Sequence, residues 1–290
     1  MQQRPLFSVL IANHNDGQYI QDTIESIFSQ TYENWEIIIV DDKSTDNSFD
    51  ILNKYKDNSR VYIYYNDINK GCGFTKKRCI EMSHGDLCGF VDADDCITSD
   101  AIQTMISAHL QNPSCSLIYS RFYYTDNRLK ITSLSSHQYD IPKESSFLTC
   151  NVPGAISHFA TFKKSCYKKT IGIDENMLRA VDIDLYLKLE EVGETFFIDK
   201  PLYFYRNNTG NNISLGDINN RKALYWNYYC RINACNRRNL SAEKIVFPTI
   251  DNMHSEENKE WYEQGREKTR ESLSYRIGKK ILLPFTWIKK

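Results

Sequence analysis

Three carboxylates directly follow an apolar run in the first third of the chain. Residues 87–91 have the composition of a buried strand, and Asp92, Asp94 and Asp95 come immediately after it. Like charges held close together repel one another and are costly to remove from water, so such a cluster usually needs a bound cation. The alternative is a polar loop whose aspartates cap the next helix, which the pattern predicts over residues 101–110.

Strands must bring these carboxylates to one edge of a sheet. Through the first half of the chain, short runs rich in β-branched residues alternate with segments of helical periodicity, which is typical of βαβ units and a mainly parallel sheet. The sequence predicts strands over residues 7–11, 36–40, 61–65 and 87–91. Three of them end in Asn or Asp, so polar side chains should line the carboxyl edge, where ligands bind in open α/β sheets. The predicted fold class is α/β.

The second half of the chain is less regular. Its pattern predicts short strands over residues 116–119, 122–124, 158–162, 196–198 and 202–205, a hairpin around 126–131 and a helix over 182–191. From about residue 219 the sequence is helical and aromatic, then polar, and finally basic and apolar.

Composition limits the classes of function. The 290 residues can form one large domain with a smaller addition. The chain has 36 Lys and Arg and 37 Asp and Glu, so its formal net charge is -1 and no nucleic-acid partner is expected. Nine cysteines without a CxxC pair indicate reduced thiols rather than disulfides or a zinc site. The start lacks a signal-peptide pattern and no stretch is long enough to span a bilayer, which predicts a cytoplasmic location.

Four segments, taken in order, resemble the family-2 glycosyltransferases with the GT-A fold. They are FSVLIANHNDGQYIQDTIESIFSQTYENWEIIIVDDKSTDNS, NKGCGFTKKRCIEMSHGDLCGFVDADD, VDIDLYLKLEEVG and PLYFYRNNTGNNIS, within roughly residues 6–210. The resemblance implies a Rossmann-like, mainly parallel sheet flanked by helices. It also implies an inverting enzyme that moves a hexose-type sugar from a nucleotide sugar, with a UDP-sugar expected, to a hydroxyl. The acceptor would be a glycan or a lipid-linked saccharide in cell-surface polysaccharide biosynthesis.

The resemblance assigns the aspartate cluster to the donor and its cation. It implies Asp95 as a direct ligand of Mn²⁺ or Mg²⁺, Asp94 as a ligand of the metal or the ribose, and Asp92 as a supporting contact to the nucleotide. Such cations prefer oxygen ligands and neutralise charge on a leaving diphosphate. The division of roles among the three carboxylates stays open.

Five further positions match the nucleotide-binding positions of the family. Asp42 would accept a hydrogen bond from the uracil imide, with a helix-capping turn as its alternative role, while Asp41 is expected to form the turn. Ala12 and His14 end the first strand where the family contacts the base, although a lone His there is equally a surface residue. Lys76 stands where the family commonly has an arginine near the nucleotide.

The fifth position, Arg206, belongs to a loop that closes over the diphosphate in relatives. The family often has a histidine two positions later, where this chain has Asn208. A contact from that position to the metal or phosphate is therefore in doubt, and His158 is not expected to replace it.

Asp182 matches the carboxylate that acts as the general base of the family. An inverting enzyme needs such a group to take the proton of the acceptor hydroxyl. The alternative is a simple cap at the start of the predicted helix, where the helix dipole stabilises a carboxylate. The family often has Glu before this aspartate, where this chain has Val181, and Asp184 is expected to pair with Lys188.

The predicted domains are a catalytic domain over residues 1–215 and a helical extension over residues 216–290. The catalytic domain would divide into a nucleotide-binding half (1–98) and an acceptor-binding half (99–215). Residues 273–290 hold five basic residues and no acidic one, with apolar residues at helical spacing. This tail suits contact with an anionic membrane surface, which would make the protein peripheral on the inner face of the membrane, or else a helix docked on the catalytic domain.

Two other functions compete with glycosyl transfer. A sugar-phosphate nucleotidyltransferase shares the α/β layout, but its Gly-rich first loop is absent, because Ala-Asn-His-Asn-Asp follows Ile11. A catalytically silent scaffold that binds nucleotide sugars is favoured only by Val181 and Asn208.

Overall fold

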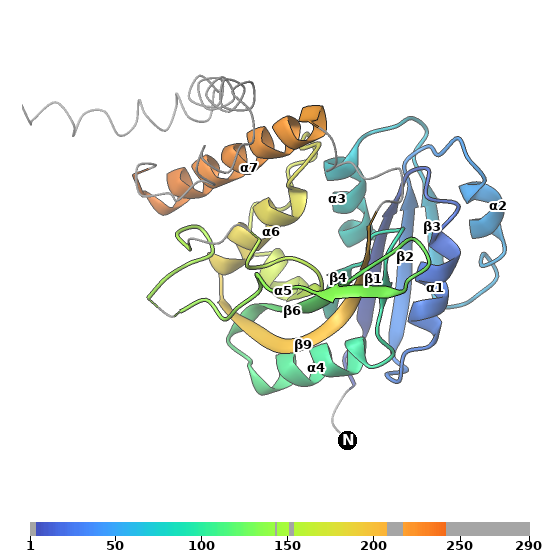
Figure 1. Ribbon diagram of the computed structural model, residues 1–290, viewed down its shortest axis with the longest axis horizontal. Coiled ribbons are helices and arrows are strands. Elements are labelled where there is room, and N and C mark those ends of the chain that lie inside the picture. The colour runs from blue at the N-terminus through green and yellow to red at the C-terminus, as the bar shows by residue number, and fades with distance from the viewer. Residues whose placement is uncertain (1–3, 143, 151–153, 208–216, 242–290) are drawn as a thin grey trace, which may run out of the picture.

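A nine-stranded sheet forms the centre of the part of the chain that the structure describes (Figure 1). The structure is a computed structural model and describes residues 4–142, 144–150, 154–207 and 217–241. The strands are β1 (Phe7–Asn13), β2 (Trp35–Asp41), β3 (Val61–Tyr65), β4 (Leu87–Phe90), β5 (Cys96–Ile97), β6 (Cys115–Thr125), β7 (Ile131–Leu134), β8 (Ala160–Lys163) and β9 (Glu194–Arg206). The helices are α1 (Ile20–Phe28), α2 (Ser48–Asn53), α3 (Cys72–Met82), α4 (Ala101–Gln111), α5 (Lys164–Tyr167), α6 (Val181–Glu190) and α7 (Asp217–Arg238).

The sheet has the order β3-β2-β1-β4-β8-β6-β9-β5, with β7 paired to β6. Strands β3, β2, β1 and β4 are parallel, which confirms the predicted βαβ units and the α/β class. Because side chains alternate along a strand, Val9 and Ile11 pack in one core with Ile24 of α1, whereas Leu10 packs in a second core with Ile80 of α3. Strands β1 and β2 are buried on both faces, which explains their continuous apolar runs, whereas β3 exposes Tyr62 and Tyr65.

Two long strands replace two pairs of short strands that the sequence predicts. Strand β6 includes both residues 116–119 and 122–124, and β9 includes both residues 196–198 and 202–205. Pro201 lies inside β9 opposite Arg121, next to shifts in the register between the two strands. Proline lacks an N–H donor and is tolerated at such irregularities. The predicted break at Pro201 is therefore wrong.

Strand β8 is antiparallel to both of its neighbours, β4 and β6. It begins at Ala160, two residues later than the sequence predicts, so His158 lies in the loop before it. The predicted hairpin is confirmed, since β6 and β7 pair antiparallel across a turn. In that turn Oδ1 of Asp126 accepts the N–H groups of Arg128 and Lys130, both at 2.9 Å.

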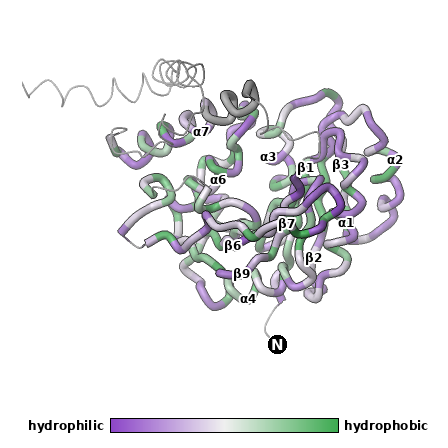
Figure 2. The backbone as a smooth tube through the Cα atoms, viewed as in Figure 1, coloured by the Kyte–Doolittle hydropathy of each residue, from purple (hydrophilic) through white to green (hydrophobic). Residues whose placement is uncertain are grey.

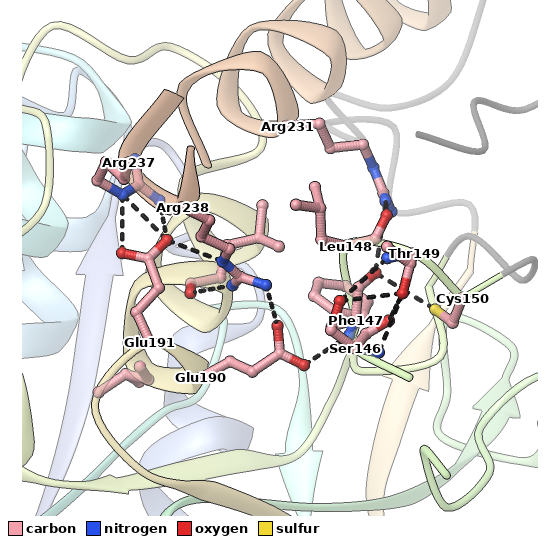
Figure 3. Close-up of polar contacts among 12 residues, drawn as sticks. Ser146, Phe147, Leu148, Thr149, Cys150, Glu190, Glu191, Arg231, Arg237 and Arg238 are labelled. Carbon is pink, nitrogen blue, oxygen red and sulfur yellow. Dashed lines mark hydrogen bonds and ion pairs between the residues drawn. The ribbon is translucent and has the colours of Figure 1, made fainter. Parts of the chain in front are cut away.

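Helix α7 packs against α6 and against the segment before residue 150 (Figure 3). Glu191, at the end of α6, lies 2.8 Å from Nε of Arg237, and Glu190 lies 2.8 Å from Nη1 of Arg238. Arg231 is 1% exposed and donates from Nη1 to the Leu148 carbonyl at 3.0 Å. Hydrophilic and hydrophobic stretches alternate along α7 (Figure 2), and its buried residues Tyr228, Cys230, Ile232, Ala234 and Cys235 join the core that contains α6.

The predicted domain boundaries at 98/99 and 215/216 stay predictions. The basic tail over residues 273–290 lies outside the described residues. Among the described helices, none combines the length and apolar character that crossing a bilayer requires. All nine cysteines are free thiols, as the sequence predicts.

Candidate active site

The carboxyl ends of β1 and β2 lie side by side at one edge of the candidate site. Asn13 and Asp41 are partners in register, and Oδ2 of Asp41 accepts a 2.7 Å hydrogen bond from the Asn13 amide. The other oxygen of Asp41 accepts the Ser44 N–H at 2.9 Å. Asp41 therefore forms the turn after β2, as the sequence predicts, and Ala12 lies half-buried at the end of β1.

Asp42 holds the loop that leads into α3. Its Oδ1 accepts the Lys70 N–H at 2.8 Å and the Asn66 side-chain amide at 2.7 Å, and its Oδ2 accepts the Gly71 N–H at 2.8 Å. Gly71 has a φ of 85°, a conformation that favours glycine. Asp42 is 4% exposed, and its carboxylate already accepts three hydrogen bonds. Its predicted contact to uracil stays a prediction.

His14 lies exposed at the same edge. Its Nδ1 is 2.9 Å from the Asp42 carbonyl oxygen, so that nitrogen carries the proton and donates. The Asn69 amide nitrogen lies 3.2 Å from Nε2, which then accepts. The imidazole is thus held in one orientation beside Asp42, where the sequence predicts a base contact.

Asp92, Asp95 and His158 form a candidate cation group. One ligand atom from each residue lies within 4.8 Å of the other two. His158 comes from the loop before β8, and the two carboxylates from the turn after β4. Asp94 is not a member of this group, although its charge acts on Asp95 as that of Asp92 does. The proposed ligand role of Asp94 stays a prediction, while His158, set aside by the sequence analysis, lies at the centre of the site.

The surroundings of Asp95 explain why a cation would fit there. Its Oδ1 accepts the Arg206 N–H and its Oδ2 accepts the Tyr203 hydroxyl, both at 2.7 Å. Burial, together with the charges of Asp94 and Asp92, raises the pKa of Asp95 well above its usual value. A bound cation would offset this repulsion. Two carboxylates and an imidazole are ligands that suit a divalent ion such as Mn²⁺.

Lys76 supplies positive charge to the same group. Its ammonium lies 3.3 Å from Oδ1 of Asp92, and its side chain is 13% exposed. Burial lowers the pKa of Lys76, but Asp92 and the other groups around the ammonium together outweigh burial, and the net shift is upward. Conversely, burial raises the pKa of Asp92, but the charges of Lys76 and His158 and the hydrogen bond from Lys76 together outweigh burial, and the net shift is downward. The cluster therefore has a basic neighbour on helix α3.

The Arg206 guanidinium points away from the aspartate cluster. It is 2% exposed, it lies over the Tyr19 ring at 4.5 Å, and its Nη2 donates to the Asp22 carboxylate at 3.1 Å. Only the main-chain N–H of Arg206 contacts Asp95. Its predicted contact to the diphosphate stays a prediction, and Asn208 lies outside the described residues.

Asp182 lies in the first turn of α6 and faces the same group of charges. Its charge contributes to the pKa values of Lys76 and His158, although burial is the largest cause for each. Helix α6 begins after Ala180, at φ 54°, without a side-chain cap. Among the described residues, no hydrogen bond reaches the Asp182 carboxylate. Asp182 therefore makes no capping hydrogen bond, while its place in the first turn is one where the helix dipole stabilises a carboxylate.

Asp184, two residues further, points into the core. It is 2% exposed and forms an ion pair with Lys188, which confirms the predicted pairing. On α7, Trp226 and Tyr229 are partly buried and pack against the same core as α6. These aromatic side chains of α7 therefore serve as core residues.

Tyr203 and His158 are the two residues of the site that sequence reasoning missed. The Tyr203 hydroxyl donates to Asp95 and accepts the Asp92 N–H at 3.1 Å, and its ring stacks on His158 with centroids 4.9 Å apart. The only signal for Tyr203 in the sequence is its place in PLYFYR, three residues before Arg206.

Comparisons with known proteins identify the family of the chain. The family described as "Glycosyl transferase family 2" matches residues 8–171. A chondroitin synthase of Escherichia coli is 29% identical over 86% of this chain, and the chain spans only 35% of that relative's length. An E. coli UDP-Glc:alpha-D-GlcNAc-diphosphoundecaprenol beta-1,3-glucosyltransferase, WfaP, is 35% identical over 51% of this chain and 57% of its own.

A solved structure shows the same fold at low sequence identity. S. aureus TarS, residues 1–349, in complex with UDP-GlcNAc, is 15% identical and superimposes with a TM-score of 0.69 over 91% of this chain and 80% of that chain. The family match covers more than half of the chain and includes the turn with the aspartates and the loop with His158. The chain therefore belongs to glycosyltransferase family 2 and has the GT-A fold.

Proposed function

We propose that the protein is a metal-dependent, inverting glycosyltransferase that moves a hexose-type sugar from a UDP-sugar to a hydroxyl. One observation carries the proposal: Asp182, which makes no capping hydrogen bond, lies close enough to Lys76 and to His158 of the candidate cation group for its charge to act on both. A base on one side and a cation site on the other are what an inverting displacement needs.

Different residues act on the leaving diphosphate and on the acceptor hydroxyl. Asp92, Asp95 and His158 would hold Mn²⁺ or Mg²⁺, which when bound neutralises charge on the departing diphosphate. The Lys76 ammonium stabilises the same negative charge. Asp182 takes the proton of the acceptor hydroxyl as that oxygen attacks the anomeric carbon.

The nucleotide would bind along the edge formed by β1 and β2. His14 and Asp42 are held next to each other there, and Ala12 lies half-buried at the end of β1. The names of similar proteins support a uridine nucleotide, because WfaP uses UDP-Glc and TarS binds UDP-GlcNAc. Asp94 is proposed to contact the ribose or the cation, and Arg206 the diphosphate, through a movement of its side chain away from Asp22.

The acceptor is proposed to be a glycan or a lipid-linked saccharide in cell-surface polysaccharide biosynthesis. The similarity to a chondroitin synthase and to an enzyme that acts on a diphosphoundecaprenol-linked sugar supports this class. Contact with an anionic membrane through residues 273–290, on the cytoplasmic side, would suit such an acceptor. The family match disfavours the nucleotidyltransferase alternative.

Release of UDP tests the proposal. Purified full-length protein is incubated with a panel of UDP-sugars and GDP-mannose, with Mn²⁺, Mg²⁺ or EDTA, and with and without saccharide acceptors. We expect release from one UDP-sugar that needs the cation and that Asp182→Asn suppresses. Binding of a UDP-sugar without release under any of these conditions would support the silent scaffold instead.

A further inference from the structure

One buried tyrosine connects both ends of the turn that carries the aspartates. Tyr203 lies in β9 and is 0% exposed. Its hydroxyl oxygen lies 2.7 Å from Oδ2 of Asp95 and 3.1 Å from the main-chain nitrogen of Asp92. The hydroxyl therefore donates to the carboxylate at one end of the turn and accepts an N–H at the other, which uses both of its hydrogen-bonding capacities.

The ring of Tyr203 reaches the third member of the candidate cation group. The rings of Tyr203 and His158 are stacked, with centroids 4.9 Å apart and planes 14° apart. One side chain thus contacts Asp92, Asp95 and His158, which come from two separate loops. This arrangement fixes the distance between the imidazole and the two carboxylates.

Strand β9 supplies a donor to each oxygen of Asp95. The Tyr203 hydroxyl occupies Oδ2 and the Arg206 N–H occupies Oδ1, both at 2.7 Å. Each carboxylate oxygen has two lone pairs, so each keeps one for a cation. The two donors set the plane of the carboxylate and do not block it.

We propose that Tyr203 is a positioning residue for the cation, whose hydroxyl holds the Asp95 carboxylate in the orientation in which it converges with Asp92 and His158. This inference rests on the proposed function of the site. Partners that orient metal ligands typically change metal affinity by about 10- to 100-fold when they are removed.

The chain offers a matched control on the same strand. Tyr205 also stacks on His158, with centroids 5.2 Å apart, but its hydroxyl makes no hydrogen bond to Asp95. Tyr203→Phe and Tyr205→Phe each remove one hydroxyl and keep a ring against the same imidazole. Only the first removes the donor to Asp95.

Mn²⁺ binding in the absence of nucleotide is measured for both full-length variants by calorimetry and by electron paramagnetic resonance of free Mn²⁺. We expect about 10-fold or greater weakening for Tyr203→Phe and a change within about threefold for Tyr205→Phe. In transfer assays, Tyr203→Phe should need more Mn²⁺ for half-maximal rate, while kcat at saturating Mn²⁺ stays near the wild-type value. UDP affinity in EDTA should be the same in all three proteins.

The outcomes separate this inference from the proposed function. Equal Mn²⁺ affinity of wild-type protein and Tyr203→Phe would overturn the role of Tyr203 and leave the proposed function standing. Wild-type protein that binds no Mn²⁺ would overturn the proposed cation site itself. A Tyr203→Phe protein that does not fold, or that loses rate equally at all Mn²⁺ concentrations, would show that the hydroxyl serves the fold rather than the cation.

Discussion

The ammonium of Lys76 lies 3.3 Å from Oδ1 of Asp92, so a lysine of helix α3 neutralises one of the carboxylates that could hold a cation. The Asp92 carboxylate could therefore interact both with the Lys76 ammonium and with a bound metal ion. Lysine is a point charge without the forked donors of arginine, so it can turn from the carboxylate toward a phosphate without breaking a two-point contact.

Replacement of Lys76 should weaken the binding of UDP without weakening the binding of Mn²⁺. In Lys76→Met, the affinity for UDP in the presence of Mn²⁺ should fall roughly 10-fold or more, because a charge-assisted contact to phosphate is lost. The affinity for Mn²⁺ alone should stay equal or rise, because the competing charge is gone. Calorimetry measures both, with Lys76→Arg as the control that retains charge. Unchanged UDP affinity in Lys76→Met would contradict a phosphate contact.

Asp182→Asn should separate catalysis from stability. Because the carboxylate makes no cap, the melting temperature should barely change, while transfer should fall by roughly 100-fold or more with loss of the base. Single-turnover rates and UDP affinity are measured on the same preparation. Transfer near the wild-type rate would place the base elsewhere, and a large drop in melting temperature would restore the capping role.

Stability should fall in mild acid because of His109. Burial, together with the charge of Lys163, lowers the pKa of His109 from 6.5 to about 3. Below pH 6.5, His109 therefore binds a proton in the unfolded chain but stays neutral in the folded protein. The folded state loses stability as the pH falls from about 6.5 toward about 3. Between pH 7 and pH 5 this amounts to roughly 2 kcal/mol.

Urea unfolding at several pH values measures the predicted loss of stability caused by His109. His109→Gln, which cannot titrate but can still hydrogen-bond to Thr161, should flatten the decline between pH 7 and pH 5. A variant whose stability falls as steeply as that of the wild type would assign the acid sensitivity to other groups.

Arg231 should matter more to folding than its neighbours on α7. Its buried guanidinium donates to the Leu148 carbonyl at 3.0 Å (Figure 3) and to the Asn227 side chain at 2.8 Å. Arg231→Met leaves these acceptors without a donor and should cost roughly 2–4 kcal/mol. Arg237→Met removes a partly exposed ion pair and should cost about 1 kcal/mol or less. Denaturant midpoints compare the two, and equal losses would contradict the central role of Arg231.

The sequence predicts the elements better than it predicts the contacts between them. Residues 36–40 are recognisable as a strand because burial on both faces of β2 leaves a continuous apolar run. The contact from Tyr203 to Asp95 joins residues that are 108 positions apart, and no local pattern indicates it. Pro201 also conceals that the predicted strands over residues 196–198 and 202–205 are one strand, because proline usually ends a strand.

Asp42 was matched to base recognition by resemblance, and the structure gives the same carboxylate a second task. It holds Asn66, Lys70 and Gly71, and therefore the start of the helix that carries Lys76. A variant of Asp42 should therefore disturb the phosphate end of the proposed donor site as well as the base end. Attempts to redesign nucleotide preference should therefore leave Asp42 in place and vary His14 or Asn69, whose side chains are exposed at the same edge.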